Sequence, residues 1–323
     1  MRISKIGFLV IPVGLISGGW GFFAHRHINQ LSIYRLPPEM MGFYKANVRF
    51  LRDAAVQPDK RRYAVPGEAE CHFIDLDHYP GDALTDTLGW KTAVNRYGED
   101  SLRRHGILPW NLVRVYQRLR EAFLAGDRER VLHLSADLGH YVGDANVPLH
   151  TTSNYDGQQT GQHGLHGLWE SRLPELHYES YDFLSGPARF VPDVRARIWS
   201  DIRRSQQMVD SVLTLERILF QQEGERKFTF ETRGSQTVRV VGNSYAAHYH
   251  RALNGMVERQ MRHAVATVSD LWYSAWVEAG QPDLRQWIGR PYSLEEMEAA
   301  RQKLQEWKVQ NLIQVRPHET GPD

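Results

Sequence analysis

Helical periodicity is the feature that most constrains the fold of this chain. Apolar residues recur at three- and four-residue spacing through most of the sequence, which places them on one face of an α-helix. A strand-type pattern occurs at 227–242, KFTFETRGSQTVRVVG, and predicts a hairpin or an irregular insertion. The sequence therefore predicts an all-α fold with a small β-prone insertion. The expected helices are two between residues 28 and 53, interrupted by a proline pair, and others at 111–126, 128–145, 193–222, 244–278 and 293–314.

Length and composition fit one helical domain. The chain has 323 residues, 41% of them hydrophobic, which suffices for a large buried core. We expect a domain over residues 20–282 and a C-terminal helical extension over 283–323. The formal net charge of +1 provides no overall field that would attract nucleic acid or anionic lipid, so any such binding must be local. No obligate protein partner is evident from the sequence.

Residues 1–19 have the layout of a secretory signal peptide. Two basic residues precede an apolar run at 6–16, and small residues follow at 17–19. This pattern predicts cleavage ahead of Trp20 and export to the periplasm or the extracellular space. An uncleaved membrane anchor is the alternative, because WGFFA extends the apolar run toward the roughly 20 residues that a membrane span requires.

Histidines and acidic residues stand four apart at two places in the chain. His140 and Asp144 lie on one face of a predicted helix, and His166 and Glu170 repeat this spacing. His150 lies between the two pairs. One pair alone is commonly a helix-surface pair, whereas two pairs and a linking histidine predict a metal site. A single cysteine excludes cysteine-rich zinc sites, and the 15 histidines supply the alternative ligand type.

The segment HYVGDANVPLH, followed by HGLWE, resembles the core of one enzyme superfamily. That superfamily contains the bacterial zinc-dependent phospholipases C and the secreted zinc nucleases specific for single strands. The resemblance covers residues 20 to about 170 and continues loosely through the predicted helix at 244–278. It implies a site that holds three zinc ions.

The resemblance also implies which residues of this chain hold each ion. The ligands of the first ion would be Asp59, His72, His140 and Asp144. Those of the second would be His25, the bridging Asp144, and Trp20 through its free amine and carbonyl as the mature N-terminus. Those of the third would be His150, His166 and Glu170, with His163 as an alternative to His166.

The chemistry implied by the resemblance is hydrolysis of phosphoric esters by a zinc-activated water. Asp59 would orient or deprotonate this water, and Arg62 would neutralise charge on the phosphate. A solvated position in the basic run KRR is the alternative for Arg62. Phe73 and Asp75 match the nuclease base pocket, where an aromatic ring stacks on the base and a carboxylate accepts its hydrogen bonds. Core packing and a helix or turn cap are the alternatives for these two residues.

Two substrate classes stay open. The spacing of the N-terminal ligands, the DxxR of Asp59 and Arg62, and the HFID element favour single-stranded nucleic acid or nucleotides. A glutamate at position 170, the short interval from His150 to His166 and the lack of any disulfide resemble the phospholipases, whose substrates are phospholipid head groups. A secreted, non-catalytic protein with structural zinc is the alternative from another class.

Overall fold

The computed structural model describes residues 22–79, 84, 88–233, 236–289 and 315–316. The structure is 69% helical, and the described part holds one two-stranded sheet. The predicted all-α fold with a small β insertion is therefore confirmed.

The helices, with shorter 3-10 and π turns between them, follow in chain order. The α-helices are α1 (Phe22–Ile33), α2 (Pro38–Ala46), α3 (Val48–Ala54), α4 (Gln57–Arg61), α5 (Trp90–Tyr97), α6 (Glu99–Arg104), α7 (Leu108–Leu124), α8 (Arg128–Ala145), α9 (Leu165–Gly167), α10 (Leu173–His177), α11 (Val194–Gln206), α12 (Val209–Glu223), α13 (Asn243–Ala252) and α14 (Met256–Glu278). The short turns are η1 (Ala69–His72), η2 (Leu76–His78), η3 (Pro148–Thr151), η4 (Leu168–Arg172), η5 (Tyr178–Ser180), η6 (Gly224–Lys227) and η7 (Leu284–Trp287).

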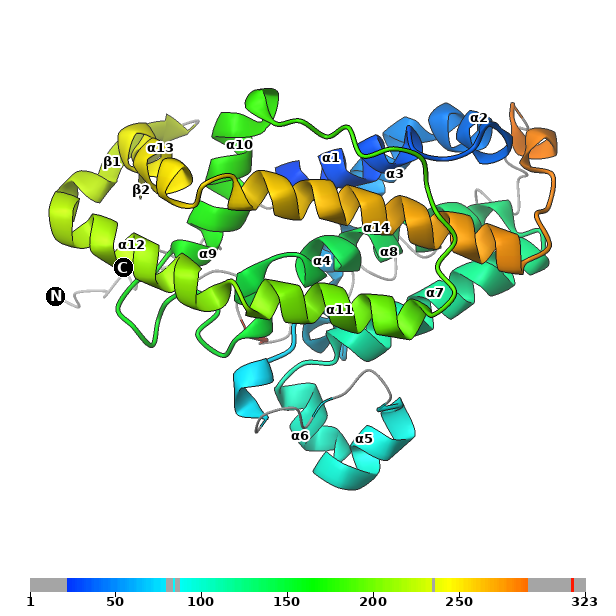
Figure 1. The fold of residues 1–323 in the computed structure, drawn as a ribbon, viewed down its shortest axis with the longest axis horizontal. Helices are drawn as coiled ribbons and strands as arrows, with labels where there is room; N and C mark the ends of the chain where they lie inside the picture. Colours follow the sequence, from blue (N-terminus) through cyan, green and yellow to red (C-terminus); the bar gives the residue numbers. More distant parts are fainter. Residues whose placement is uncertain (1–21, 80–83, 85–87, 234–235, 290–314, 317–323) are drawn as a thin grey trace, which may run out of the picture.

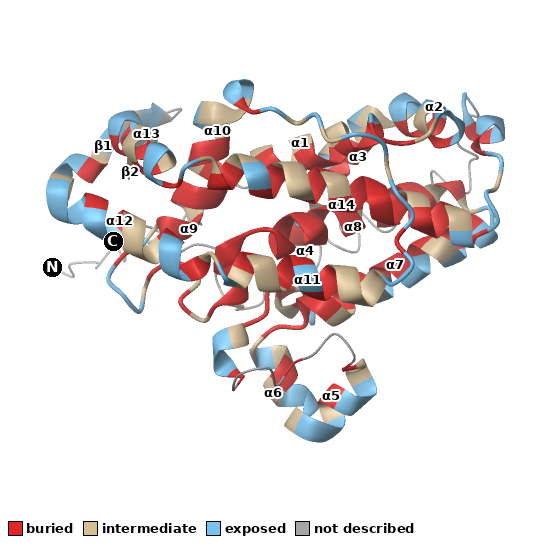
Figure 2. Cartoon of the chain, in the orientation of Figure 1, coloured by how far each residue is buried: buried red, intermediate tan, exposed pale blue. Residues whose placement is uncertain are grey.

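Helix α8 forms the centre of the helical body. It packs against α1, α3, α7 and α14, and α14 also packs along α1 and α7 (Figure 1). Buried residues concentrate on these central helices, whereas α5 and α6 project from the body and expose most of their surface (Figure 2). Because α8 is covered on nearly every side, polar residues along it must find partners inside the protein.

Buried polar contacts fix the central helices against one another. The Nδ2 atom of Asn29 on α1 donates hydrogen bonds to Leu51 O and Ala136 O, both at 3.2 Å, and so joins α1 to α3 and α8. The indole nitrogen of Trp272 on α14 donates to Ser135 O at 3.0 Å. These contacts set the position of α8 relative to its neighbours.

Several predicted helices are interrupted in the structure. The helix predicted at 244–278 is two helices, α13 and α14, and Gly255 between them has a φ of +73° that a helix cannot continue. The helix predicted at 193–222 divides into α11 and α12. The stretch 28–53 contains three helices, because Asn47 separates α2 from α3. Apolar periodicity continues across these breaks and does not reveal them.

The predicted β-prone insertion is an antiparallel hairpin. Strand β1 (Phe228–Arg233) pairs with β2 (Gln236–Val241), with Phe228 opposite Val241. Lys227, just before β1, is buried and forms an ion pair with Glu216 of α12 at 2.6 Å. This buried pair ties the hairpin to the helical body.

The predicted signal peptide, Trp20 and the expected helix at 293–314 lie outside the described residues. Within the described part, no helix combines the length and the apolar character that crossing a bilayer requires.

We expect the substitution Asn29→Ala to lower the free energy of unfolding by about 2 kcal/mol, because it removes two buried hydrogen bonds that join α1 to α3 and α8. Denaturant unfolding of the metal-free protein measures this change. The control is Asn95→Ala on the exposed surface of α5, which should shift stability by less than about 0.5 kcal/mol. Equal effects of the two substitutions would contradict the role of Asn29.

Candidate metal centre

The predicted metal ligands in the described part meet in one buried cluster. Each of them is at most 9% exposed. The cluster consists of His25, Asp59, His72, His140, Asp144, His150, His166 and Glu170. Trp20, the remaining predicted ligand, lies outside the described residues. His163, the alternative to His166, is exposed and is not part of the cluster.

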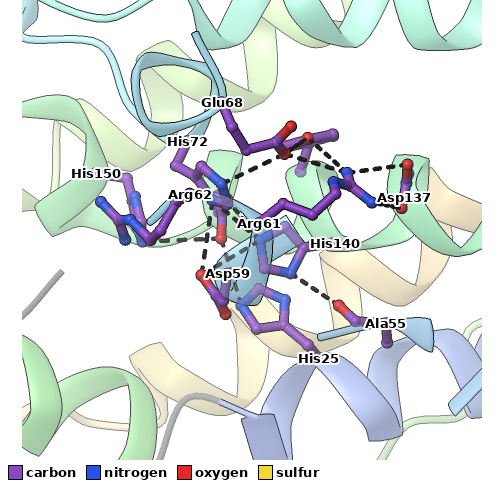
Figure 3. A network of polar contacts seen from close by, with 12 residues as sticks. His25, Ala55, Asp59, Arg61, Arg62, Glu68, His72, Asp137, His140 and His150 are labelled. Atoms are coloured by element: carbon purple, nitrogen blue, oxygen red, sulfur yellow. Dashed lines mark hydrogen bonds and ion pairs between the residues drawn. The ribbon is translucent and has the colours of Figure 1, made fainter. Parts of the chain in front are cut away.

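Six segments far apart in the sequence supply these side chains. They are α1, α4, η1, α8, η3 and the helical run α9–η4–α10. Figure 3 shows His25, Asp59, His72 and His140 pointing toward one another, with His150 to one side. The cluster therefore exists only when all six segments are packed in place.

The first ligand group lies where α4, η1 and α8 meet. His72 Nδ1 and His140 Nε2 are 3.0 Å apart, and Asp144 Oδ2 lies 3.0 Å from the former and 3.3 Å from the latter. Asp59 Oδ1 lies 3.7 Å from both nitrogens. Asp59, His72 and His140 thus form a group that could hold a metal ion, and Asp144 lies beside its two imidazoles.

Two carboxylates connect this group to the rest of the cluster. Asp144 Oδ1 lies 3.3 Å from His25 Nε2, as expected of a bridging ligand. Glu170 Oε1 lies 3.1 Å from His25 Nε2, while its Oε2 lies 2.7 Å from His166 Nε2 and 3.4 Å from His150 Nε2. Glu170 therefore faces two ligand groups, whereas the sequence predicted it for the third ion alone.

Hydrogen bonds to the backbone fix the orientation of two imidazoles. His140 Nδ1 donates to Ala55 O at 2.9 Å, and His166 Nδ1 donates to Tyr155 O at 2.8 Å. In the neutral ring, each Nε2 then carries a lone pair aimed at the cluster. The lone pair of His166 faces the Glu170 carboxylate at 2.7 Å, which is repulsive unless a proton or a cation lies between them. Such backbone-oriented imidazoles are typical of metal ligands.

One carboxylate oxygen at the centre of the cluster also lacks a hydrogen bond. Within the described part, Asp144 Oδ1 accepts none, although Asp144 is fully buried. A buried carboxylate oxygen needs a donor or a cation. The residues therefore fit a bound cation at Asp144.

Burial shifts the pKa values in the cluster toward uncharged groups. It raises the pKa of Asp144 well above the usual range, with the nearby Asp59 as a further cause, and raises the pKa of Asp59 to about 6. It lowers the pKa of His150 to about 4 and that of His140 well below its usual value. The carboxyl groups of Asp59 and Asp144 therefore stay protonated to a higher pH than usual, and below their pKa values a bound cation must displace the protons.

A π-helical turn carries one of the candidate ligands. Residues Leu168–Arg172 form this turn between α9 and α10, and Glu170 lies within it. Pro174 follows four residues later and has no N–H to donate to the Glu170 carbonyl, which favours a locally widened turn. His166 and Glu170 nevertheless remain in contact across this turn.

A close approach of α1 and α8 places His25 in the cluster. A Cβ atom at Gly143 would lie 2.6 Å from His25 Nδ1, which is shorter than real contacts allow. Only glycine therefore permits His25 to reach Asp144 at this helix crossing.

The other predicted site residues are also buried beside the cluster. Arg62 is 2% exposed, so its alternative as a solvated residue of the KRR run is wrong. Phe73 is 6% and Asp75 is 4% exposed. Asp75 begins η2 but its side chain makes no capping bond there, and it accepts hydrogen bonds from Arg316 instead. The structure thus excludes a cap as the role of Asp75.

Sequence reasoning missed four residues at the site. Ala55 and Tyr155 orient ligands through backbone carbonyls, which carry no sequence signal. Thr152 and Arg316 contact the pocket formed around Phe73 and Asp75. The position of Arg316, 241 residues from Asp75, could not be inferred from local spacing.

A comparison of the chain with models of known protein families found no match, and a search of curated proteins found no relative. The argument for function therefore depends on the geometry of the site.

We expect binding of a divalent metal ion, with zinc as the probe, to release protons and to weaken as the pH falls. Below the Asp59 pKa of about 6, the ion must displace a proton from this carboxyl, so the apparent affinity should fall about tenfold per pH unit for each proton displaced. Calorimetric titration in two buffers of different ionisation enthalpy counts the protons. Asp59→Asn should reduce the count, and Asp53→Asn on the exposed surface should not. A pH-independent affinity between pH 5 and 7 would contradict this expectation.

We expect Gly143→Ala to reduce the number of ions bound, because the added methyl group displaces His25 while the ligands from α4 and η1 stay in place. Elemental analysis of the purified protein gives the metal-to-protein ratio. Gly89→Ala, where the added Cβ meets its nearest neighbour at 3.8 Å, is the control and should retain the full ratio. A full ratio in Gly143→Ala would show that His25 is not a ligand.

Proposed function

We propose that this protein is a metal-dependent hydrolase of phosphoric esters, with zinc as its ion. The observation that carries the proposal is the position of Arg62. Its guanidinium is buried beside the ligand cluster, and within the described part its Nε and Nη1 donate no hydrogen bond. A buried cation with open donors next to a metal centre is suited to an anionic group of a substrate.

Charge explains why the substrate should be a phosphoric ester. Figure 3 shows Arg62 beside Asp59 and His150, and its charge offsets part of the rise that burial causes in the pKa values of Asp59 and Asp144. Leaving two guanidinium donors without partners in a buried site costs free energy. A phosphoryl group offers several oxygens that can accept hydrogen bonds from a planar guanidinium while they also approach the ligand cluster.

The residues of the chain have distinct roles in this proposal. Asp59, His72, His140 and Asp144 would hold one ion, His25 with Asp144 and Glu170 a second, and His150 with His166 and Glu170 a third. Bound zinc supplies an activated water and stabilises the leaving oxygen. Asp59 orients the attacking water, and Arg62 neutralises negative charge that develops on the phosphoryl oxygens. Burial of the whole cluster strengthens each of these interactions.

Single-stranded nucleic acid or nucleotides are the favoured substrates. Phe73 and Asp75 lie buried on the chain segment that directly follows His72, and Tyr155 packs at the same place. Aromatic rings with a carboxylate are suited to stack on a base and accept its hydrogen bonds. A phospholipid head group is the second candidate, favoured by the glutamate at position 170. The proposal includes export and cleavage ahead of Trp20, because the free amine of Trp20 would then add a ligand beside His25.

The decisive experiment compares substrates with zinc-loaded protein that begins at Trp20. Hydrolysis of single-stranded DNA or RNA and of phosphatidylcholine is measured with and without a chelator. We expect chelator-sensitive cleavage of nucleic acid. Chelator-sensitive release of phosphocholine would move the protein to the second candidate. No turnover of either substrate by protein that contains zinc would favour a structural zinc site.

We expect Arg62→Gln to lower kcat/KM about 100-fold on the cleaved substrate, because the substitution removes a cation that stabilises charge in the transition state. The metal-to-protein ratio should not change, since Arg62 is not a ligand. Lys60→Gln, at an exposed position two residues before Arg62, is the matched control and should retain activity. Unchanged kinetics in Arg62→Gln would remove the main support for the proposal.

A further inference from the structure

Arg316 lies in the pocket formed by Phe73, Asp75, Thr152 and Tyr155. Its guanidinium carbon is 4.0 Å from the ring centroid of Phe73 and 4.0 Å from that of Tyr155. Its Nη1 donates to Asp75 Oδ1 at 2.8 Å and Oδ2 at 3.1 Å, and its Nη2 donates to Thr152 O at 3.2 Å. A planar group with N–H donors thus fills a pocket of aromatic rings and acceptors.

The backbone of the same residue contacts the residue proposed to bind phosphate. The carbonyl oxygen of Arg316 accepts a hydrogen bond from Arg62 Nη2 at 3.2 Å. Arg316 therefore places a planar hydrogen-bonding group against the aromatic rings and an oxygen against Arg62. A nucleotide bound with its base on Phe73 and its phosphate at Arg62 would use these same partners.

We propose that Arg316 inhibits the protein by occupying the nucleotide site as an intramolecular mimic of the substrate. The guanidinium takes the place of the base, and the carbonyl oxygen takes the place of a phosphate oxygen. This inference rests on the proposed function, because it assigns a regulatory contact to the same site. Substrate must displace Arg316 before it can reach Arg62.

The walls of the pocket are held in place independently of Arg316. The Asp75 backbone N–H donates to His105 O at 2.7 Å. Asp77 accepts hydrogen bonds from Thr152 Oγ1 at 2.7 Å and from the Ser153 N–H at 3.0 Å. These bonds hold the backbone of Asp75 and the segment at Thr152 and Ser153 without the participation of Arg316.

The acceptors of the pocket select a particular base. When Arg316 leaves, the buried Asp75 carboxylate needs a new donor, and its side-chain partner in the described part is then His105, at 3.3 Å. Carboxylate and carbonyl acceptors side by side suit a planar ring with two adjacent N–H groups. Guanine offers N1–H and N2–H along one edge, whereas the other common bases place an acceptor beside their donor. A quaternary ammonium head group could contact the rings but has no hydrogen to donate to Thr152.

The first test measures binding of GMP to full-length protein by calorimetry, both metal-free and zinc-loaded. We expect Arg316→Ala to bind GMP at least about tenfold more tightly than the unmodified chain, because no internal group competes. Arg316→Lys, which keeps the charge but loses the planar group, should behave like Arg316→Ala. Arg285→Ala, whose side chain is 81% exposed, is the matched control and should leave GMP affinity unchanged.

The second test supplies the inhibitory residue in trans. A synthetic peptide of residues 309–323 is added to full-length Arg316→Ala, and displacement of GMP is measured. We expect the natural peptide to compete and the same peptide with Arg316→Ala not to compete. Because this test adds the residue back, it does not depend on how the substitution affects folding.

The outcomes separate this inference from the proposed function. Tighter GMP binding in Arg316→Ala without hydrolysis of any phosphoric ester would support the pocket assignment and refute the enzymatic proposal. Equal GMP affinity and equal kcat/KM in the unmodified chain and Arg316→Ala would overturn the inference while hydrolysis still stands. Preferential binding of phosphocholine over GMP by Arg316→Ala would overturn it in favour of a lipid head group.

Discussion

The structure depends on how the charge of the buried carboxylates clustered around the C-terminal end of α8 is balanced. Asp144 is fully buried, and Asp59 and Glu170 lie close enough for their charges to raise its pKa further. Such carboxylates are tolerated inside a protein when protons or cations neutralise them. The surrounding imidazoles accept a cation readily, because burial keeps His140 and His150 uncharged and the backbone orients the ring of His140. The residues that could hold a metal ion therefore also affect the stability of the core.

Helix packing provides the precision that such a site requires. Asn29 fixes α1 against α3 and α8, and Gly143 permits the close crossing that brings His25 to Asp144. The bridging Glu170 comes from a helical run with a π turn on another side of the cluster. Because helix packing orients these side chains toward one another, the fold itself lowers the cost of ordering the candidate ligands.

Two arginines connect the ligand cluster to the residues around Phe73 and Asp75. Arg62 presents donors beside the ligands, and Arg316 fills the adjoining pocket and contacts Arg62 through its carbonyl oxygen. In the proposed mechanism, Arg62 binds the phosphoryl group, while Arg316 competes with the base of the nucleotide. Substrate binding and its inhibition by Arg316 would then involve neighbouring residues, and the affinity for substrate would depend on both arginines.

Local spacing in the sequence determined the helical class, the hairpin and the two ligand pairs, because residues four apart share a helix face whatever the rest of the chain does. The family resemblance supplied His25, Asp59 and His72, which no local spacing connects to α8. Tertiary structure alone decided that Glu170 faces two ligand groups, that Arg62 is buried, and that Arg316 fills the pocket at Asp75. The reason is physical: these contacts join segments far apart in the chain, and their geometry depends on how the helices pack.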